Sequence, residues 1–171
     1  MAMKKFLCVF LAMFTLTLTG CGGGKEVYSG DGWKISYDPN KWKVTFEAKD
    51  GTVSFGHIKL DKTSFAVTYC PYYNRGVVDE SGISMNERLE RSRESCERNG
   101  WLWSGEIIEI DGIEWGRVEF QYEDLMSAVY FHYDNSDPFY ACNLSFVAEP
   151  DVYYNGLKDF EEIFDGFKIT E

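Results

Sequence analysis

The residues with the most obvious chemistry are the two histidines of the chain, His57 and His132. A serine or cysteine nucleophile is activated by a histidine base, so any such site must use one of them. His132 lies between Phe131 and Tyr133 in a predicted strand, and His57 lies late in another strand beside Gly56. No serine is framed by the glycines of a nucleophile elbow. Both histidines are therefore predicted to be hydrogen-bonded sheet residues, and the sequence predicts no catalytic residue and no enzymatic activity.

Carboxylates occur in pairs, but their positions favour solvation over catalysis. General acid–base catalysis needs one carboxyl group held in an apolar pocket with a raised pKa. The pairs lie instead at predicted hairpin ends and on a helix surface, and the one in the 134–137 turn lacks the glycine and the distant glutamate of a calcium loop. No glycine loop is placed to hold phosphate. The sequence thus predicts neither a metal site nor a cofactor; the pairs are Glu106/Glu109, Glu123/Asp124, Asp134/Asp137 and Glu161/Glu162.

Aromatic side chains give the one positive indication of a binding site. The chain has 5 tryptophans, 11 tyrosines and 13 phenylalanines. Pairs at the predicted ends of strands and helices should leave at least one ring exposed, and exposed Trp and Tyr are frequent in binding sites for proteins and can stack on sugars. The alternative is that so many rings cannot all face a small core. The candidate binding surface consists of Tyr72, Tyr73, Trp101 and Trp103.

The N-terminus carries the pattern of a secretory signal peptide. Two lysines precede an apolar run over residues 6–18, which is shorter than the about 20 residues needed to span a membrane. The segment Leu18-Thr19-Gly20-Cys21 resembles the lipobox of bacterial lipoproteins, with Thr19 where Ala or Ser is more usual. The resemblance implies cleavage between Gly20 and Cys21 and acylation of Cys21, which would anchor the protein in the cell membrane, facing the extracytoplasmic side. The alternative is an ordinary signal peptide cut elsewhere, with Cys21 a plain thiol.

The rest of the chain is predicted to form one acidic domain on a short tether. We assign residues 1–20 to the signal, 21–31 to the lipidated cysteine and a glycine-rich tether, and 32–171 to a single domain. Removal of the signal leaves 15 basic and 28 acidic residues, a charge of −13. Such a surface repels phosphate backbones and anionic headgroups, so we expect no nucleic-acid partner and a domain that stands off the membrane. We expect a monomer that is attached to membrane lipid through acylated Cys21. We expect its domain to bind an envelope protein.

Three further cysteines, Cys70, Cys96 and Cys142, have neither the CxxC nor the Cys/His spacing of a metal site. An exported compartment permits one disulfide among them, with a thiol left over. Cys96 and Cys142 fall on predicted core faces, where a buried thiol acts as a small hydrophobe. The sequence leaves the pairing open.

These residues must be positioned by a sheet and two helices. Alternating apolar and polar residues predict strands, and a 3.6-residue apolar period predicts helices. Asp111-Gly112 is typical of a type I′ hairpin turn. The strand 125–133 carries apolar residues on both faces, so it must be central and covered on both sides. The predicted strands span 33–37, 41–48, 52–60, 64–69, 104–110, 113–122, 125–133, 139–147 and 167–169. One predicted helix begins at Ser84, and the other spans 151–165.

The first helix is predicted together with its cap. Ser84 and Glu87 form a capping box before the helix. One face of the helix is predicted to be buried, and its residues are Met85, Leu89, Ser92 and Cys96. The opposite face is charged, with Glu90, Arg91, Arg93, Glu94, Glu97 and Arg98. We therefore expect an amphipathic helix that lies on a sheet, in a fold of the α+β class.

Two parts of the chain resemble PsbP-like domains. The first is Gly32-Trp33-Lys34-Ile35-Ser36-Tyr37-Asp38-Pro39 with Trp42 after it, where Asp38 is more acidic than the family's usual residue. The second is the aromatic strand 140–147 with Phe160-Glu161-Glu162-Ile163 and Phe167-Lys168-Ile169. The resemblance implies an antiparallel sheet of about six or more strands sandwiched between helices, a fold shared with a eukaryotic Ran-binding nuclear-import factor. It implies no partner, because photosystem II binding and Ran binding belong to particular branches.

Together these features predict a non-enzymatic lipoprotein whose PsbP-like domain binds an envelope partner. Two alternatives stay open: a small envelope hydrolase with an unrecognised site, and a sugar- or ligand-binding module that uses exposed aromatics. A histidine in a cleft with a carboxylate and a hydroxyl or thiol would favour the hydrolase. Burial of the four candidate aromatic residues would exclude the sugar-binding module.

Overall fold

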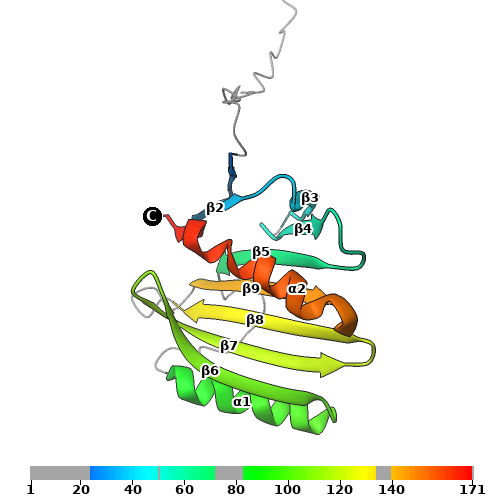
Figure 1. Ribbon diagram of the computed structural model, residues 1–171. Helices are drawn as coiled ribbons and strands as arrows, with labels where there is room; N and C mark the ends of the chain where they lie inside the picture. The colour runs from blue at the N-terminus through cyan, green and yellow to red at the C-terminus, as the bar shows by residue number, and fades with distance from the viewer. Residues whose placement is uncertain (1–23, 50, 72–82, 134–139, 171) are drawn as a thin grey trace, which may run out of the picture.

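A computed structural model describes residues 24–49, 51–71, 83–133 and 140–170, and its main element is an antiparallel sheet of seven strands (Figure 1). In spatial order these strands are β3 (Trp42–Glu47), β4 (Val53–His57), β5 (Ser64–Pro71), β9 (Tyr140–Ala148), β8 (Leu125–Tyr133), β7 (Ile113–Tyr122) and β6 (Leu102–Ile110). A second sheet has three strands, β1 (Glu26–Ser29), β2 (Trp33–Tyr37) and β10 (Lys168–Ile169). The helices are α1 (Met85–Arg98), α2 (Pro150–Glu161) and the short 3₁₀ helix η2 (Phe164–Gly166). The predicted α+β class is confirmed.

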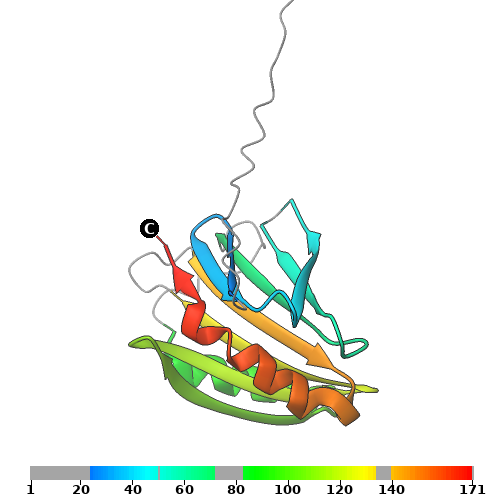
Figure 2. The same ribbon diagram turned by 45° about the horizontal axis from the view of Figure 1, so that its top comes forward.

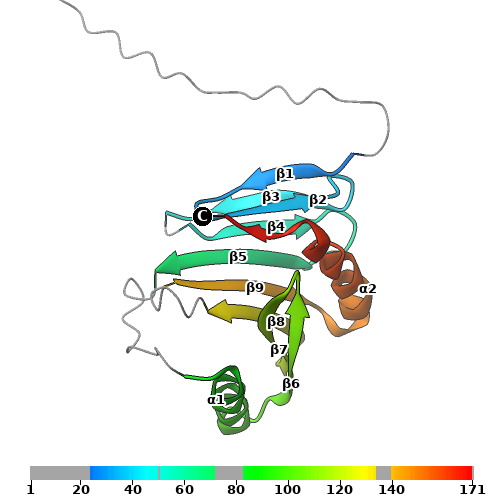
Figure 3. The ribbon, with the colours of Figure 1, turned by 90° about the vertical axis from the view of Figure 1, so that its left-hand side faces the viewer.

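The two faces of the large sheet are covered unequally. The small sheet and α2 lie on one face, where β2 packs over β3–β5 and α2 contacts β8 and β9 (Figure 2). Helix α1 lies on the opposite face and contacts β6 and β7 at one edge (Figure 3). The predicted helices on both faces are therefore confirmed, whereas the second sheet is an addition that the sequence analysis did not predict.

The main core fills the space between the large sheet and the α2 layer. It is built on stacked rings: Phe146 of β9 lies 5.3 Å from Phe160 of α2, and Phe65 of β5 lies 4.5 Å from Phe55 of β4. All four rings are almost fully buried. Helix α2 comes close to β9 because Gly156 has no side chain; a Cβ there would lie 2.9 Å from Phe146.

Strand β8 confirms the prediction of a strand that is buried on both faces. Ala128 and Tyr130 belong to the main core, while Phe131 and Val129 belong to a smaller cluster beneath α1. The register explains why, because side chains alternate between the two faces of a strand and β8 lies between β9 and β7. The order of the strands makes β8 an inner strand, as predicted.

The local signals at the start of α1 and at the hairpin turn are also found. Ser84 is the N-cap of α1, and its hydroxyl accepts a hydrogen bond from the Glu87 amide at 3.3 Å. The carboxylate of Glu87 accepts instead from Arg91 at 3.1 Å, so half of the capping box is confirmed. Asp111 and Gly112 have φ angles of 54° and 77°, as a type I′ turn requires.

The N-terminal boundary of the fold differs from the predicted one. Strand β1 lies within residues 21–31, which we assigned to the tether, and it pairs with β2 along its whole length. The domain thus begins before residue 32. The sequence analysis did not predict β1, because four residues with few large apolar side chains form too short a pattern. Gly20 and Cys21 lie outside the described residues. Within the described part of the chain, none of the helices is long and apolar enough to cross a membrane.

The ring stack between the sheet and α2 predicts a large effect of truncating Phe160. The substitution Phe160→Ala leaves a cavity among fully buried rings, so it should lower the free energy of unfolding by about 3–5 kcal/mol. Tyr154→Ala is the matched control, because Tyr154 is an aromatic residue of the same helix that is 70% exposed. The control should cost less than about 1 kcal/mol in chemical denaturation. Equal effects of the two substitutions would show that α2 is not held by this stack.

Candidate functional site

His57 is tied into the fold by both of its ring nitrogens. Its Nδ1 accepts hydrogen bonds from the amides of Lys59 and Leu60 at 3.1 and 3.0 Å. The ring proton must then lie on Nε2, which donates to Oδ2 of Asp159 at 3.1 Å. Although a carboxylate lies beside His57, neither nitrogen is left to act as a base. The side chain instead joins the end of β4 to α2.

Lys41 extends this contact into a small ion-pair network. Its Nζ lies 2.7 Å from Oδ1 of Asp159 and 2.7 Å from Oε2 of Glu162, both on the α2 side of the domain. Burial raises the pKa of Asp159, but the hydrogen bonds from Lys41 and His57 outweigh it, so the pKa lies below its ordinary value. The same pairing raises the pKa of Lys41. The network is structural and fixes the end of α2.

His132 is the second histidine, and it is also a sheet residue. Its Nδ1 donates to the carbonyl oxygen of Glu114 at 2.9 Å, and its ring lies 5.5 Å from that of Trp115. A pocket of about 260 Å³ brings His132 together with Glu114, Ser84 and Tyr133, but the Ser84 hydroxyl caps α1. Among the described residues, no hydroxyl or thiol is hydrogen-bonded to either histidine. The described part of the chain also contains no group of three or more His, Cys, Asp or Glu residues that could hold a metal ion.

A charged cluster around Arg117 lies on the α2 side of the sheet. Arg117 donates to the Tyr130 hydroxyl at 3.0 Å and pairs with Glu106 at 2.6 Å and with Glu119 at 2.5 Å. The Tyr130 hydroxyl in turn donates to Glu161 of α2 at 2.7 Å. Burial and the Glu161 hydrogen bond raise the pKa of Tyr130, which therefore stays protonated. The cluster links three strands to α2 and leaves its arginine fully engaged.

Two of the four aromatic residues of the predicted surface lie in the described part of the chain. Trp101 is 37% exposed, and its ring stacks on Phe120 with centroids 5.6 Å apart and planes 12° apart. Trp103 is half-buried and packs against the small cluster beneath α1. Tyr72 and Tyr73 lie outside the described residues. The exposure of Trp101 means that the ligand-binding alternative stays open.

The cysteines of the domain are placed as the sequence predicts where they are described. Cys96 of α1 and Cys142 of β9 are both buried. Burial raises the pKa of the Cys96 thiol, which is not in a disulfide. The side chain of Cys70 lies outside what the structure describes.

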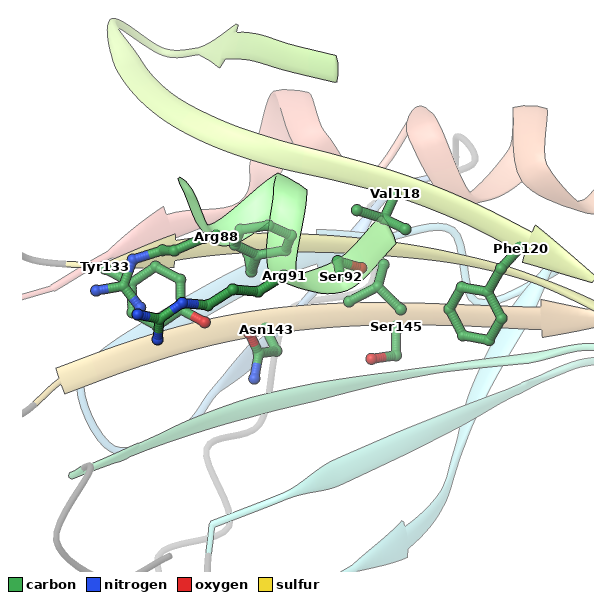
Figure 4. A pocket seen from close by; sticks show the side chains of 10 residues that line it. Arg88, Arg91, Ser92, Val118, Phe120, Tyr133, Asn143 and Ser145 are labelled. Atoms are coloured by element: carbon green, nitrogen blue, oxygen red, sulfur yellow. The ribbon is translucent and has the colours of Figure 1, made fainter. Parts of the chain in front are cut away.

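A pocket of about 330 Å³ lies between α1 and the open part of the large sheet. Figure 4 shows that its two ends differ: Arg88, Arg91, Tyr133 and Asn143 gather at one end, and Phe120 lies at the other. Helix α1, β7, β8 and β9 all contribute to it. Its lining consists of Arg88, Arg91, Ser92, Val118, Phe120, Val129, Phe131, Tyr133, Asn143 and Ser145.

The cationic end of this pocket, which we call the α1 pocket, is built around Arg88. This residue is 9% exposed, and its guanidinium carbon lies 3.5 Å from the centroid of the Tyr133 ring. Burial raises the pKa of Tyr133 to about 12, so the phenol is neutral at ordinary pH. The sequence analysis missed Arg88, whereas Arg91 is exposed, as predicted, although its side chain reaches the pocket. A signal was present, because Arg88 follows Met85 by three residues and therefore stands on the buried side of the helix.

Comparison with known proteins identifies the fold. No family model matches the chain, and no curated protein is significantly similar to it in sequence. The solution structure of cyanobacterial PsbP (CyanoP) from Synechocystis sp. PCC 6803 superposes with a TM-score of 0.57 at 13% identity, over 89% of this chain and 98% of that one. The fold is PsbP-like.

Two further solved structures share this fold. A crystal structure from Bacteroides thetaiotaomicron has a TM-score of 0.55 at 14% identity; the match covers 87% of this chain and 49% of that one. A point mutant of the protein Mog1 has a TM-score of 0.54 at 12% identity and is matched over 97% of its length and 86% of this chain. At such identities the comparison establishes the PsbP-like fold alone, so the function must be argued from the site.

The Asp159 network predicts a specific dependence of stability on pH. Because the pKa of Asp159 is lowered in the folded state, its contribution is present above the unfolded-state pKa of about 3.9 and is lost as the pH falls through the folded-state pKa. Asp159→Asn should therefore lower the free energy of unfolding by about 1 kcal/mol at neutral pH. Its difference from the wild type should shrink towards zero in acid. Denaturation at several pH values measures this.

The control for this measurement is Glu94→Gln, which removes an exposed carboxylate on the outer side of α1. It should leave the pH profile of stability unchanged. A difference between Asp159→Asn and wild type that stays constant down to low pH would contradict the role given to the ionised carboxylate.

Proposed function

We propose that this protein is a lipid-anchored, non-enzymatic binding module of the cell envelope, and that its PsbP-like domain binds a small ligand in the α1 pocket. The observation that carries the proposal is the pocket itself. Its volume of about 330 Å³ falls in the usual range for small-molecule sites, and its walls combine apolar side chains with polar and charged ones. This is the composition that such sites share.

The geometry of the histidines argues against the hydrolase alternative. Hydrolysis by a serine or cysteine needs a ring nitrogen that can take the proton of the nucleophile. Both nitrogens of His57 are engaged with Asp159 and two backbone amides, and Nδ1 of His132 is engaged with a backbone carbonyl. These contacts favour a structural role for His57, and no hydroxyl or thiol among the described residues is hydrogen-bonded to His132, so we assign no catalytic step to the domain.

The membrane anchor rests on the N-terminal sequence. The lipobox-like Leu18-Thr19-Gly20-Cys21 supports acylation of Cys21, and the acyl chains would each add about 0.8 kcal/mol of membrane affinity per buried methylene. Strand β1 begins at Glu26, so few residues separate Cys21 from the domain. In this proposal the acidic domain stands just outside the membrane and presents its pocket to the envelope space.

The anchor is tested by Cys21→Ser. In cells fed an alkyne analogue of palmitate, the wild type should become labelled and fractionate with membranes. Cys21→Ser should be unlabelled and should leave the membrane fraction. The control is Cys8→Ser, which removes a cysteine within the apolar run and should behave as the wild type. Labelling of Cys21→Ser, or loss of labelling in Cys8→Ser, would contradict acylation at Cys21.

The binding site is tested by filling the pocket from the sheet side. Ser145 of β9 points into the α1 pocket (Figure 4), and Ser145→Phe should occupy it with a ring. Small molecules that shift the amide resonances of α1 and β7–β9 in the wild type should lose at least about tenfold in affinity for the variant. Ser104→Phe, on the exposed strand β6, is the control and should bind normally. Ligands that bind Ser145→Phe as well as the wild type would refute the site.

A further inference from the structure

The three-stranded sheet has one face in the main core and one face outside it. Trp33 and Ile35 of β2 belong to the core, so the alternate side chains of β2 point outward. Residues directly opposite each other in neighbouring strands share one face, and the register therefore gives β1, β2 and β10 a common outer face. This outer face, which we call the small-sheet face, consists of Val27, Ser29, Lys34, Ser36 and Lys168.

The small-sheet face carries two lysines, and none of its five residues is acidic. Lys34 and Lys168 lie directly opposite each other in β2 and β10, and both are exposed. Within the described part of the chain, neither takes part in an ion pair. Like charges directly opposite each other weaken a strand pair. The pairing of β2 with β10 would therefore gain from an anion that lies over both ammonium groups.

The carboxylates near this face are directed elsewhere. Glu26 of β1 lies opposite Tyr37 on the inner side of the sheet and accepts a hydrogen bond from the Tyr37 hydroxyl at 2.9 Å. Asp31, between β1 and β2, and Asp165 of η2 are both exposed. In the described chain, neither of these two forms an ion pair with a lysine of the small-sheet face. The face is therefore open to an external anion.

The negative charge of the protein lies mainly in another part of the chain. Residues 24–71, which contain β1–β5, have seven basic and six acidic residues, whereas residues 72–171 have eight basic and 22 acidic ones. Figure 3 shows β1 at one end of the molecule and α1 at the other end. The repulsion from anionic headgroups that the net charge predicts is therefore weakest at the end of the molecule that contains the small sheet.

The chain holds the small-sheet face close to the proposed anchor. Strand β1 begins at Glu26, five residues after Cys21. Even when fully extended, five residues span at most about 18 Å. This is about two Debye lengths at physiological ionic strength, so charges on the small sheet lie within reach of the headgroup potential. An anchor at Cys21 thus brings this face of the domain to the membrane first.

We propose that the small-sheet face docks on the anionic membrane in which Cys21 is anchored, with Lys34 and Lys168 at lipid phosphates and Val27 among the headgroups. The inference rests on the proposed anchor and adds an orientation to it. Ammonium groups and serine hydroxyls donate hydrogen bonds, as the phosphate oxygens of lipids require. Each lysine close to an anionic leaflet favours binding by about fivefold. Val27 is 65% exposed and adds an apolar contact.

The test attaches the domain to lipid chemically, so that it does not depend on acylation in cells. The chain from residue 21 contains every described element. Cys96 and Cys142 are buried, so Cys70→Ser leaves Cys21 to react with a maleimide lipid in nanodiscs. A nitroxide on the lipid headgroups then broadens the amide resonances that lie near the membrane. With about one third phosphatidylglycerol in phosphatidylcholine, β1, β2 and β10 should broaden at least about threefold more than α1.

Two double variants with the same change of charge assign the orientation to the small-sheet face. Lys34→Gln with Lys168→Gln should reduce the difference in broadening between the small sheet and α1 at least about twofold. It removes two like charges that lie opposite each other, so it should not lower the stability of the free domain. The control is Arg98→Gln with Lys158→Gln, which changes exposed residues of α1 and α2. It should keep the wild-type pattern of broadening.

Three results would overturn the inference. They are equal broadening of the small sheet and α1, the same pattern in phosphatidylcholine alone, and equal effects of the two double variants. Each of these leaves the proposed anchor and the α1 pocket standing. A lack of palmitate labelling in cells would refute the anchor but would not change the pattern on the nanodiscs, so the two failures are distinguishable.

Discussion

The contact on which the rest of the structure depends is the ring stack between Phe146 of β9 and Phe160 of α2, 5.3 Å apart and fully buried. It sets the spacing of the α2 layer from the sheet, and Gly156 permits that spacing. The large side chains of β9 belong to the main core and point to the α2 side, because side chains alternate across a strand. The other face of β9 presents Asn143 and Ser145 to the α1 pocket. The α1 pocket is thus a consequence of how the main core is packed.

The surroundings of the charged side chains also differ between the two faces of the large sheet. On the α2 side, Lys41 and Arg117 are each surrounded by at least two carboxylates and serve to hold α2 against the sheet. In an acidic chain this is the expected use of a cation. On the α1 side, Arg88 lies over the Tyr133 ring and lines a cavity.

Much of the fold could be predicted from local patterns. The strand 125–133 was predicted to be covered on both faces, since apolar residues stand at successive positions, and β8 is so covered. The Ser84 cap and the Asp111-Gly112 turn were predicted from residue types with strong backbone preferences. Local patterns could not predict which strands pair with one another. Residues 33–37 were predicted to form a strand, but their pairing with β10 joins the two ends of the domain and separates β2 from the large sheet.

The candidate site was harder to predict for the same reason, because the pocket exists only where α1 packs beside the paired strands β7, β8 and β9. One residue nevertheless breaks a local rule. Helical spacing places Arg88 on the buried side of α1, where a leucine or methionine would avoid the cost of desolvating a charge. Sequences that specify a fold obey such rules at most positions and depart from them mainly at functional sites. A buried arginine stacked on Tyr133, beside a cavity with polar and apolar walls, is a departure of this kind, and it is the reason to look for the function of this domain beneath α1.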